Sequence, residues 1–396
     1  MTALPMKDRF ELPEGVIYLD GNSLGPLPLS VPARVGDVVR DEWGAHLIKG
    51  WNLDGWMAQP LSVADRIARI IGVPPGSTVL GDTLSIKVHQ ALSAAFDMRP
   101  DRKIILSDNG NFPTDLYMAQ GLIRQLGAGH ELRTPDPDGV ADAITSDVAV
   151  VMLTQVDYRT GRMHDMADIT RRAHAAGAVM IWDLAHSAGA VPLDIAGSNV
   201  EFAVGCTYKY LNGGPGAPAF IYVRPDLVDG IAPALSGWLG HDAPFAFEPD
   251  YRPAGDIERF RVGTPPVLQI AALDAALALW DDVDMGDLRR ASIRLSELFI
   301  SEVEARCPEL TLASPRDPEQ RGSQVSFSYA HGYAVMQALI AHRVIGDYRH
   351  PNIMRFGFTP LFLDENDIVQ AVDILQEIIA NRLWDDPKFT TKHRVT

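Results

Sequence analysis

The chain has 396 residues, of which 46% are hydrophobic and 22% charged, and its formal net charge is −16. This composition is typical of a globular protein large enough for two domains, and an acidic balance without a basic run argues against a nucleic-acid partner. The two cysteines, Cys206 and Cys307, lie far apart without a C-x-x-C pair or a histidine cluster. We therefore exclude a disulfide scaffold and a structural zinc site, and we expect no bound metal.

The N-terminal region predicts an arm followed by helix. Residues 1–30 contain a short apolar strand and then Asn, Gly and Pro turn signals, and residues from about 31 to 72 favour helix with an irregular break at 49–56. No apolar stretch near the start is typical of a signal peptide, and none approaches the roughly 20 residues that span a bilayer. We expect a soluble, cytoplasmic protein with no membrane partner.

Between about residues 75 and 225, short apolar runs alternate with helical patterns such as LSIKVHQALSAAF and DMADITRRAHAAGA. This alternation predicts an α/β layer with a mostly parallel sheet, in which the apolar runs are strands buried on both faces. The predicted strands are Thr78–Leu80, Lys103–Leu106, Val148–Leu153, Ala178–Trp182, Phe202–Val204 and Ala219–Val223.

The pattern changes after Pro265 and Pro266. VLQIAALDAALALW and DMGDLRRASIRLSELFISEVEARC predict long helices, while QVSFSYA and IMRFGFTPLF predict strands. We interpret this part as a smaller α+β domain. The predicted division is an arm at 1–30, a large α/β domain at 31–265 and a small C-terminal domain at 266–396.

Asp183 and Lys209 are the first candidates for chemistry. Each follows an apolar run, and ligands of open parallel sheets bind outside the carboxyl ends of the strands. One lysine and one carboxylate in the same crevice are what pyridoxal phosphate needs, because the amine forms a Schiff base and the carboxylate pairs with the protonated ring nitrogen. Taken alone, the pair could equally be a structural salt bridge.

The sequence around these residues resembles the kynureninase family, which has the aspartate-aminotransferase fold (fold type I). The resemblance lies in VMIWDLAHSAGAVPLD and GCTYKYLNGGPGAPAF, and it continues in order through other segments over nearly the full length. These are YLDGNSLGPLP (18–28), NFPTDLYMAQGL (111–122), VMLTQVDYRTGRMHDM (151–166), LSGWLGH (235–241), VGTPP (262–266) and IMRFGFTPLF (353–362). It implies a large domain with a mostly parallel, seven-stranded sheet and a smaller α+β domain.

The resemblance also implies roles for individual residues around pyridoxal 5'-phosphate. Lys209 would carry the cofactor, Asp183 would bind its ring nitrogen, and Tyr208 would bind the phosphate and relay protons. Leu84 and Ser85 lie at a strand-to-helix turn that suits a phosphate, and Ser85 could equally be an N-cap, a role compatible with phosphate binding. Further expected cofactor contacts are Phe112, Pro113, Thr114, Asp115, Thr154 and His186, with Trp238 and Thr264 reaching the phosphate from the neighbouring subunit of a homodimer. Without the resemblance, Phe112 and Trp238 would be interpreted as core residues and Thr264 as a turn residue.

For the substrate, the resemblance implies hydrolysis of L-kynurenine to anthranilate and L-alanine. Arg355 lies inside an apolar run, where a buried guanidinium needs an anion, and that anion is either the substrate's α-carboxylate or an internal Asp or Glu. Trp51, Gly263 and Thr264 resemble a pocket that prefers kynurenine to 3-hydroxykynurenine, although Trp51 could merely pack the break near residue 50.

Two other functions remain open on the sequence. A cysteine desulfurase or another class V aminotransferase relative would share the fold, but a desulfurase needs a nucleophilic Cys on a mobile loop. Neither Cys206, close to the lysine, nor Cys307, at a helix end, suits that role. A non-enzymatic regulatory relative is disfavoured because Lys209, Asp183 and Arg355 are all present.

Overall fold

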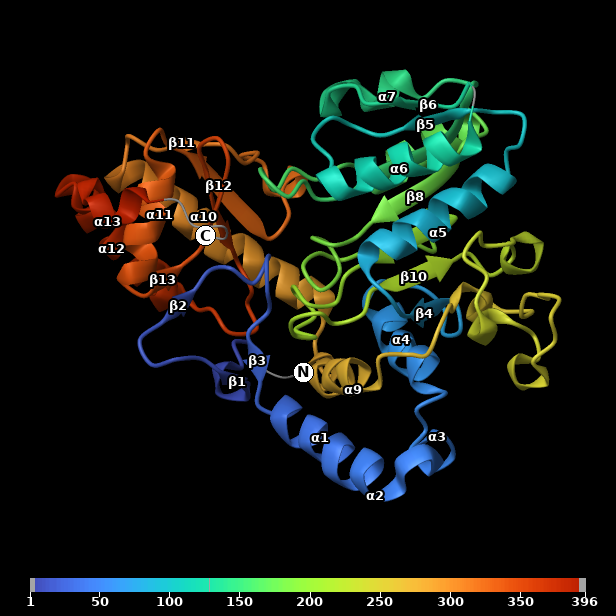
Figure 1. Ribbon diagram of the computed structural model, residues 1–396. Helices are drawn as coiled ribbons and strands as arrows, with labels where there is room; N and C mark the ends of the chain where they lie inside the picture. The colour runs from blue at the N-terminus through green and yellow to red at the C-terminus, as the bar shows by residue number, and fades with distance from the viewer. Residues whose placement is uncertain (1–3, 128, 392–396) are drawn as a thin grey trace.

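The centre of the fold is a seven-stranded sheet in a computed structural model that describes residues 4–127 and 129–391 (Figure 1). Every strand runs parallel to its neighbours except β10, which pairs antiparallel with β4 and β9. This confirms the predicted mostly parallel sheet. The spatial order is β4 (Thr78–Leu80), β10 (Phe220–Val223), β9 (Phe202–Gly205), β8 (Val179–Asp183), β7 (Val148–Thr154), β5 (Ile104–Leu106) and β6 (Glu131–Arg133).

Each of the six predicted apolar runs corresponds to one strand of this sheet. All residues of strands β4, β5, β7, β8, β9 and β10 are buried. Strand β6 had no such signal, because it consists of Glu131, Leu132 and Arg133 and all three are at least partly exposed. It lies at one edge of the sheet, where a strand has a neighbour on one side only.

Helices cover both faces of the sheet. Helices α5 (Leu84–Asp97) and α6 (Pro113–Leu126) pack together on one face, where Ile105, Ile181 and Val204 belong to the same apolar cluster. On the other face, α4 (Gln59–Ile70) and α8 (Met166–Ala175) share a cluster with alternate strand residues such as Met180 and Trp182. Because successive side chains of a strand point to opposite faces of the sheet, alternate strand residues belong to the apolar clusters on its two sides.

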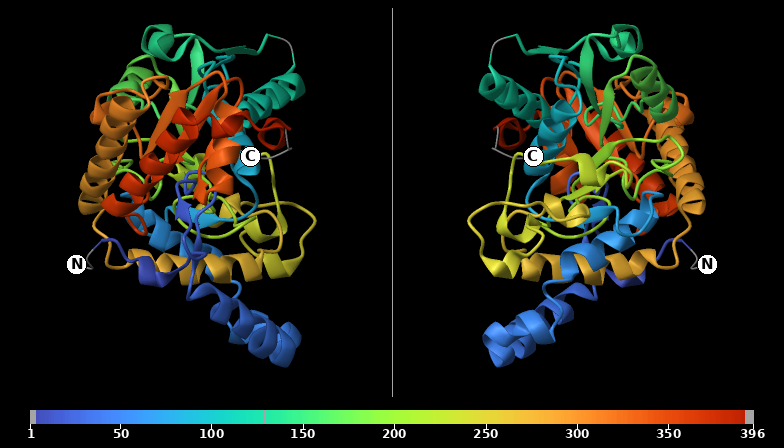
Figure 2. Two further views of the ribbon diagram at one scale, coloured as in Figure 1. Left: turned by 90° about the vertical axis from the view of Figure 1, so that its left-hand side faces the viewer. Right: turned by 90° about the vertical axis from the view of Figure 1, so that its right-hand side faces the viewer.

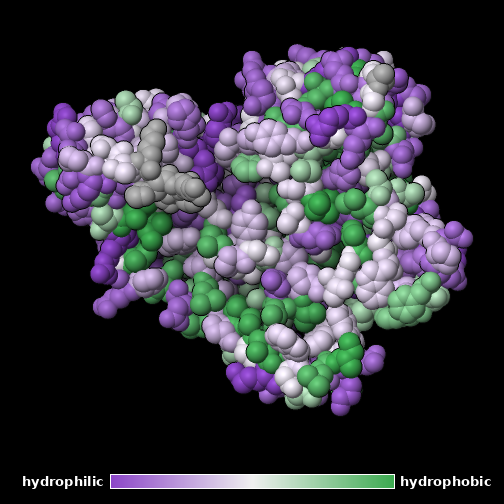
Figure 3. Space-filling model, viewed as in Figure 1, coloured by the Kyte–Doolittle hydropathy of each residue, from purple (hydrophilic) through white to green (hydrophobic). Residues whose placement is uncertain are grey.

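The segment before α4 is irregular, as predicted. Helix α1 (Val31–Asp37) continues into a π-helical turn (Val38–Trp43), α2 (Gly44–His46), a 3-10 turn (Leu47–Lys49) and α3 (Gly50–Leu53). Figure 2 shows this segment extending away from the body of the molecule, and Figure 3 shows apolar residues gathered over it. Several of its apolar side chains are exposed, among them Trp43, Leu47, Ile48 and Leu53.

The C-terminal part is α+β, as predicted. Its four-stranded antiparallel sheet has the order β11 (Thr311–Leu312), β12 (Gln324–Ser328), β15 (Ile353–Gly357) and β14 (Asp347–Arg349). Helices α10 (Met285–Arg306) and α11 (Gly332–Ala341) pack against it, α12 (Glu365–Ala380) packs against these two helices, and α13 (Pro387–Thr390) follows. The domain division at residues 30 and 265 stays a prediction. Helix α9 (Val267–Leu277), just beyond the second boundary, packs against α1 and α4.

The N-terminal arm joins the two parts. Strand β1 (Phe10–Glu11) pairs with β3 (Leu27–Pro28), and β2 (Ile17–Tyr18) pairs in parallel with β13 (Val344–Ile345) of the C-terminal part. Between β2 and β3, the backbone N–H of Gly25 donates to Tyr208 O at 2.8 Å. A Cβ at Gly25 would lie 2.4 Å from Lys209 O, so only glycine allows this approach.

Within the described residues, no helix combines the length and apolar character needed to cross a membrane.

Candidate active site

Two polar side chains end neighbouring strands at the carboxyl edge of the sheet. Thr154 is the last residue of β7 and Asp183 the last of β8, and the two are paired in register. Lys209 follows β9, the next strand along, after the turn that begins at Cys206. Parallel strands present their carboxyl ends at one edge, which is why these three residues lie together.

Asp183 is buried and held by short local contacts. Its Oδ1 accepts from the backbone N–H of Ala185 at 2.8 Å, and the Thr154 hydroxyl lies 3.1 Å from its Oδ2. Burial raises the pKa of Asp183, while Lys209 and these hydrogen bonds oppose the rise. The donors favour the ionised carboxylate.

A second buried carboxyl, Asp115 near the start of α6, interacts with Asp183. Burial and the charge of Asp183 raise the pKa of Asp115 well above its usual value. Its Oδ2 is buried and has no hydrogen-bond partner among the described residues. Two neighbouring carboxyls in a dry site share one proton, and Asp115 has fewer donors to stabilise its charge. Asp115 is therefore the protonated member of the pair and Asp183 the ionised one.

His186 contacts the lysine. Its Nε2 lies 2.9 Å from Lys209 Nζ, and its Nδ1 is buried with no partner among the described residues. Burial lowers the pKa of His186 well below its usual value, and the charges of Lys209, Arg355 and Arg349 act in the same direction. The ring is therefore neutral, so Nε2 can accept a hydrogen bond from the Lys209 amine.

Tyr208 and Cys206 flank the lysine. The Lys209 Nζ lies 5.8 Å from the centre of the Tyr208 ring. Burial raises the pKa of the Tyr208 phenol, with a further contribution from Cys206, so the hydroxyl stays protonated and can donate a hydrogen bond. Burial also raises the pKa of the Cys206 thiol, whose Sγ lies 3.9 Å from Ala185 O.

Asn111, which the sequence analysis did not select, makes hydrogen bonds to both Thr154 and Phe112. Its Oδ1 lies 2.5 Å from the Thr154 hydroxyl and accepts from the Phe112 backbone N–H at 2.6 Å. Its Nδ2 donates to the Ser107 hydroxyl at 3.0 Å. Asn111 thus connects Thr154 to the FPTD segment. The only sequence signal was its position directly before Phe112.

Helix α5 places Leu84 and Ser85 at its first two positions. The N-cap is Thr83 and not Ser85, so the N-cap alternative for Ser85 is wrong. The Thr83 side chain makes no capping hydrogen bond, which leaves the first backbone N–H groups of the helix without that cap. Phe112 is 43% exposed and meets Tyr158 edge to face at 5.1 Å, so it is not a core residue. Pro113 and Thr114 are half-buried beside it.

Arg355 is buried on β15 and already has an internal acidic partner. Its Nε donates to Asp347 Oδ1 at 2.5 Å, its Nη2 to Asp347 Oδ2, and its Nη1 to Tyr158 O. Nη2 also donates to the Ser23 hydroxyl at 2.9 Å. Of the five guanidinium protons, one on Nη1 is left over. The sequence left open an internal partner or a substrate carboxylate, and the internal partner is present.

Trp51, Trp238, Gly263 and Thr264 lie apart from this cluster. Trp51 packs edge to face against Trp56 at 5.4 Å, as the alternative interpretation of Trp51 expected. Trp238 is 41% exposed, and Gly263 and Thr264 are exposed in a loop. Within the described chain, none of the four has a hydrogen bond or ring contact with Asp183, His186 or Lys209.

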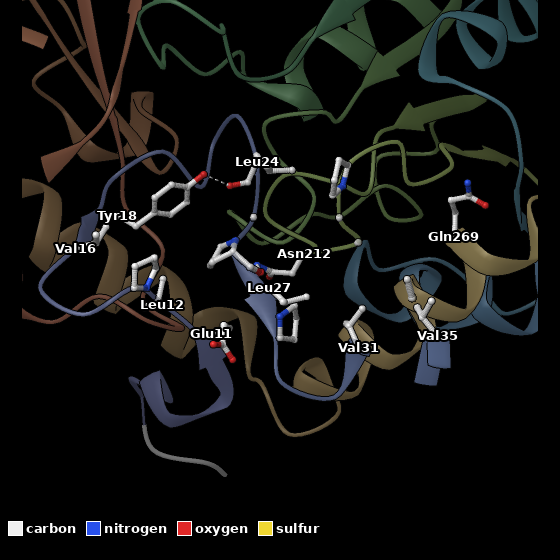
Figure 4. Close-up of a pocket in the computed structure, with 18 of the residues that line it drawn as sticks. Glu11, Leu12, Val16, Tyr18, Leu24, Leu27, Val31, Val35, Asn212 and Gln269 are labelled. Atoms are coloured by element: carbon white, nitrogen blue, oxygen red, sulfur yellow. Dashed lines mark hydrogen bonds between the residues drawn. The ribbon is translucent and has the colours of Figure 1, made fainter. Parts of the chain in front are cut away.

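An apolar cavity next to the glycine-rich turn after Lys209 is a separate feature. Its volume is about 520 Å³, and Asp183, His186 and Lys209 do not line it. Figure 4 shows Tyr18 and Leu24 of the arm at one side and Val31, Val35 and Gln269 at the other, with Asn212 between them. The cavity therefore lies where the arm, α1 and α9 meet the glycine-rich turn after Lys209.

The buried groups fit pyridoxal phosphate. The ionised Asp183 needs a positive partner, which a protonated pyridine nitrogen supplies, and the buried Asp115 oxygen lacks a hydrogen-bond partner among the described residues. The uncapped start of α5 suits a phosphate, and Lys209 offers the amine.

Solved structures with the same fold include a cysteine desulfurase of Thermococcus onnurineus NA1, with TM-score 0.82, 18% identity and 96% and 99% of the two chains covered. The cysteine desulfurase CsdA of Escherichia coli matches with TM-score 0.79, 19% identity and 95% and 98% coverage. Fold and site together define a pyridoxal-phosphate enzyme of fold type I.

Sequence comparison gives the family. The kynureninase of Pseudomonas fluorescens is 49% identical over 99% of this chain and 96% of the relative, and that of Burkholderia pseudomallei (strain 1106a) is 48% identical with the same coverage. Residues 288–375 match the kynureninase C-terminal domain. The chain belongs to the kynureninase family, which confirms the resemblance found in the sequence.

Proposed function

We propose that this protein hydrolyses L-kynurenine to anthranilate and L-alanine in tryptophan catabolism, using pyridoxal 5'-phosphate, in the cytoplasm. The observation that carries the proposal is the half-buried Lys209 amine beside the buried Asp183 and His186 at the carboxyl edge of the sheet, in a chain 49% identical to a curated kynureninase. This reaction breaks the bond between Cβ and Cγ of the substrate and consumes one water.

The cofactor, when bound, withdraws electrons from the substrate carbon next to the amine. Lys209 would attach it, Asp183 would hold its ring nitrogen in the protonated form, and Phe112 would lie against the ring. The N–H groups of Leu84 and Ser85 and the Tyr208 hydroxyl would bind the phosphate. Thr154, His186, Asp115, Pro113 and Thr114 would complete the pocket around the ring.

The proton transfers are assigned to Lys209 and Tyr208. Lys209 Nζ would take the α-proton of the substrate, and neutral His186, 2.9 Å away, would orient the amine by accepting its hydrogen bond. Tyr208 keeps its phenolic proton because burial raises its pKa, so it would serve as a donor and proton relay.

Arg355 would bind the α-carboxylate of the substrate. Asp347 occupies the Nε and Nη2 side of the guanidinium, so the carboxylate would approach the Nη1–Nη2 edge and replace the Ser23 contact. Trp51, Gly263 and Thr264 would line the aromatic end of the substrate.

A homodimer with shared sites accounts for the residues that lie apart. Trp238 and Thr264 are exposed on one subunit, and we propose that they reach the phosphate bound to the other. The apolar cavity beneath the arm and the exposed apolar side chains of α1–α3 would then be covered by the second subunit.

Cysteine desulfurase activity, suggested by the solved structures, lacks a nucleophile. Both cysteines are buried, and burial raises the pKa of each thiol, to about 11 for Cys307. A reactive thiolate needs exposure and a lowered pKa.

The test is an assay of purified holoenzyme with L-kynurenine, followed by the fluorescence of anthranilate, and with L-cysteine, followed by sulfide release. We expect anthranilate and L-alanine in equal amounts and no sulfide. Sulfide without anthranilate would overturn the proposal.

A further inference from the structure

Four charged side chains meet beneath the N-terminal arm, next to the proposed substrate site. Arg355 and Arg349 contribute two positive charges, and Asp347 and Asp20 contribute two carboxyls. Asp347 lies on β14, the neighbour of β15, and Asp20 follows β2 of the arm. Arg355 donates to Tyr158 O, and the Tyr158 ring meets Phe112 edge to face at 5.1 Å, which places this cluster beside the proposed cofactor site.

Asp347 has all its hydrogen bonds satisfied. It accepts from Arg355 on both oxygens, from Arg349 Nη2 at 2.8 Å and from the Ser23 hydroxyl at 2.6 Å. Burial alone would raise the pKa of Asp347, but Arg355 and Arg349 lower it below its ordinary value. Asp347 therefore stays ionised and neutralises one of the two arginines.

Asp20 is the less satisfied carboxyl. Its Oδ1 is buried and has no hydrogen-bond partner in the described part of the chain. Burial and the charge of Asp347 raise its pKa to about 7, against the opposing effects of Ser23, Arg355 and Arg349.

The two tyrosines near Asp20 use their phenolic protons elsewhere. Tyr18 donates to Leu24 O at 2.8 Å and Tyr210 to Ser323 O at 3.1 Å, and burial raises the pKa of both. Neither can therefore neutralise Asp20 by giving it a proton. Protonation of Asp20 has to come from solvent.

Binding an α-carboxylate at Arg355 would change the charge balance. With Asp20 ionised, two cations face two anions, and a third anion leaves an excess negative charge in a buried place, which is unfavourable. With Asp20 protonated, the incoming carboxylate restores the balance. We infer that Asp20 is a positioning residue of the substrate-carboxylate site. When Asp20 is ionised, its negative charge disfavours a carboxylate at Arg355. As the carboxylate binds, Asp20 takes up one proton and this repulsion is removed.

This inference rests on the proposed function, because it assumes an α-carboxylate at Arg355. The probe is L-alanine, the proposed product, titrated into holoenzyme by calorimetry in two buffers of different ionisation enthalpy, which gives the number of protons taken up. The variants are Asp20→Asn, which mimics the protonated carboxyl, and Asp20→Glu, which keeps a titratable one. Asp65→Asn on α4, where the carboxylate accepts from Gly76 N–H, is the matched control.

We expect the wild type and Asp20→Asn to bind L-alanine equally at about pH 5.5, and Asp20→Asn to bind about tenfold more tightly near pH 8.5. Proton uptake should fall in Asp20→Asn by up to one proton per site, and remain in Asp20→Glu and Asp65→Asn. L-Alaninamide, which lacks the carboxylate, should show no difference between the variants.

Equal proton uptake and equal pH dependence in the wild type and Asp20→Asn would overturn the inference, while anthranilate production from L-kynurenine would leave the proposed function intact. The opposite result, proton-linked L-alanine binding without cleavage of L-kynurenine, would support the inference and refute the proposed function.

Discussion

At the scale of single residues, the contact between Lys209 Nζ and His186 Nε2 gives the sharpest prediction. Lys209→Ala removes the amine, so the protein should lose its covalently held, yellow cofactor and more than about 100-fold of its turnover. Borohydride reduction and peptide mapping should locate the label at Lys209 in the wild type. Lys388→Ala, at an exposed lysine near the C-terminus, is the control and should keep both colour and activity. A label on any other lysine contradicts the assignment.

Replacing Asp183 is expected to reduce catalysis more than cofactor binding. In Asp183→Ala the ring nitrogen loses its ionised partner, and burial alone still raises the pKa of Asp115, so that carboxyl replaces Asp183 poorly. Turnover should fall by more than about 100-fold, while cofactor occupancy falls much less, because Lys209 and the start of α5 remain. Absorbance and turnover measured on the same sample would check this, and near-normal turnover would refute the role of Asp183.

Substrate preference is decided by the residues that would line the aromatic end. Trp51 is bulky and Gly263 has no side chain, so neither offers a defined partner for an extra hydroxyl, and an unpaired buried hydroxyl is unfavourable. We expect kcat/KM for L-kynurenine to exceed that for 3-hydroxykynurenine by at least about tenfold. Equal values, or a preference for the hydroxylated substrate, would contradict this pocket.

At the scale of elements, α12 begins with a capping box. The Asp364 carboxylate accepts from the backbone N–H of Asp367 at 3.0 Å, the Asp367 side chain accepts from Asp364 N–H at 2.8 Å, and Lys7 of the arm bonds Asp364 at 3.2 Å. Asp364→Ala should lower the free energy of unfolding by about 1 kcal/mol, measured by urea denaturation. Glu365→Ala, at the next and exposed position, should change it by less than about 0.5 kcal/mol.

The cap also has a pH dependence. Burial alone would raise the pKa of Asp364, but the Asp367 N–H and Lys7 lower it below its ordinary value. Its contribution is therefore complete above the ordinary carboxyl pKa and is lost as the pH falls through the lower folded value. If the difference between wild type and Asp364→Ala persisted unchanged in strong acid, the ionised cap would not be its cause.

Elements differ in how far the sequence determines them. The buried strands and α10 could be predicted because their apolar patterns are long and α10 starts at a capping Asp284. Edge strand β6 could not, since its single apolar residue, Leu132, lies between Glu131 and Arg133. Lys209 and Asp183 could be found from the sequence because of their residue types at the ends of predicted strands. The roles of Asn111, Asp347 and Asp20 depend on their surroundings in the folded chain. An Asn or Asp in the sequence does not indicate such surroundings.

At the scale of the whole molecule, the separation of Trp238 and Thr264 from Lys209 predicts sites shared between two subunits. Lys209→Ala and Trp238→Ala should each be weak or inactive alone. In a mixed dimer one site carries both changes, and the other combines an intact Lys209 with an intact Trp238. Mixing the two variants under subunit exchange should therefore restore activity to about half of the mixed dimer's sites.

Two controls make this test decisive. Differential tagging confirms that subunits exchange, and Trp238→Ala is first shown to be defective by itself. If mixing then restored nothing, Trp238 would serve the site of its own chain, and the shared-site arrangement would be wrong.

The arm has a consequence for how the enzyme matures. Ile17 pairs with Val344, and Ser23 bonds Asp347, 324 residues further along the chain. Contacts between such distant segments form late, because the loop between them must first close. The arm leaves the ribosome before the C-terminal part, so it cannot form these contacts until the segment around residues 344–347 has been synthesised. A chain that ends before Val344 contains Asp183 and Lys209, but it has neither the partner strand of the arm nor Arg355, the residue proposed to bind the substrate carboxylate. The proposed carboxylate site is thus completed only when the C-terminal part has been synthesised.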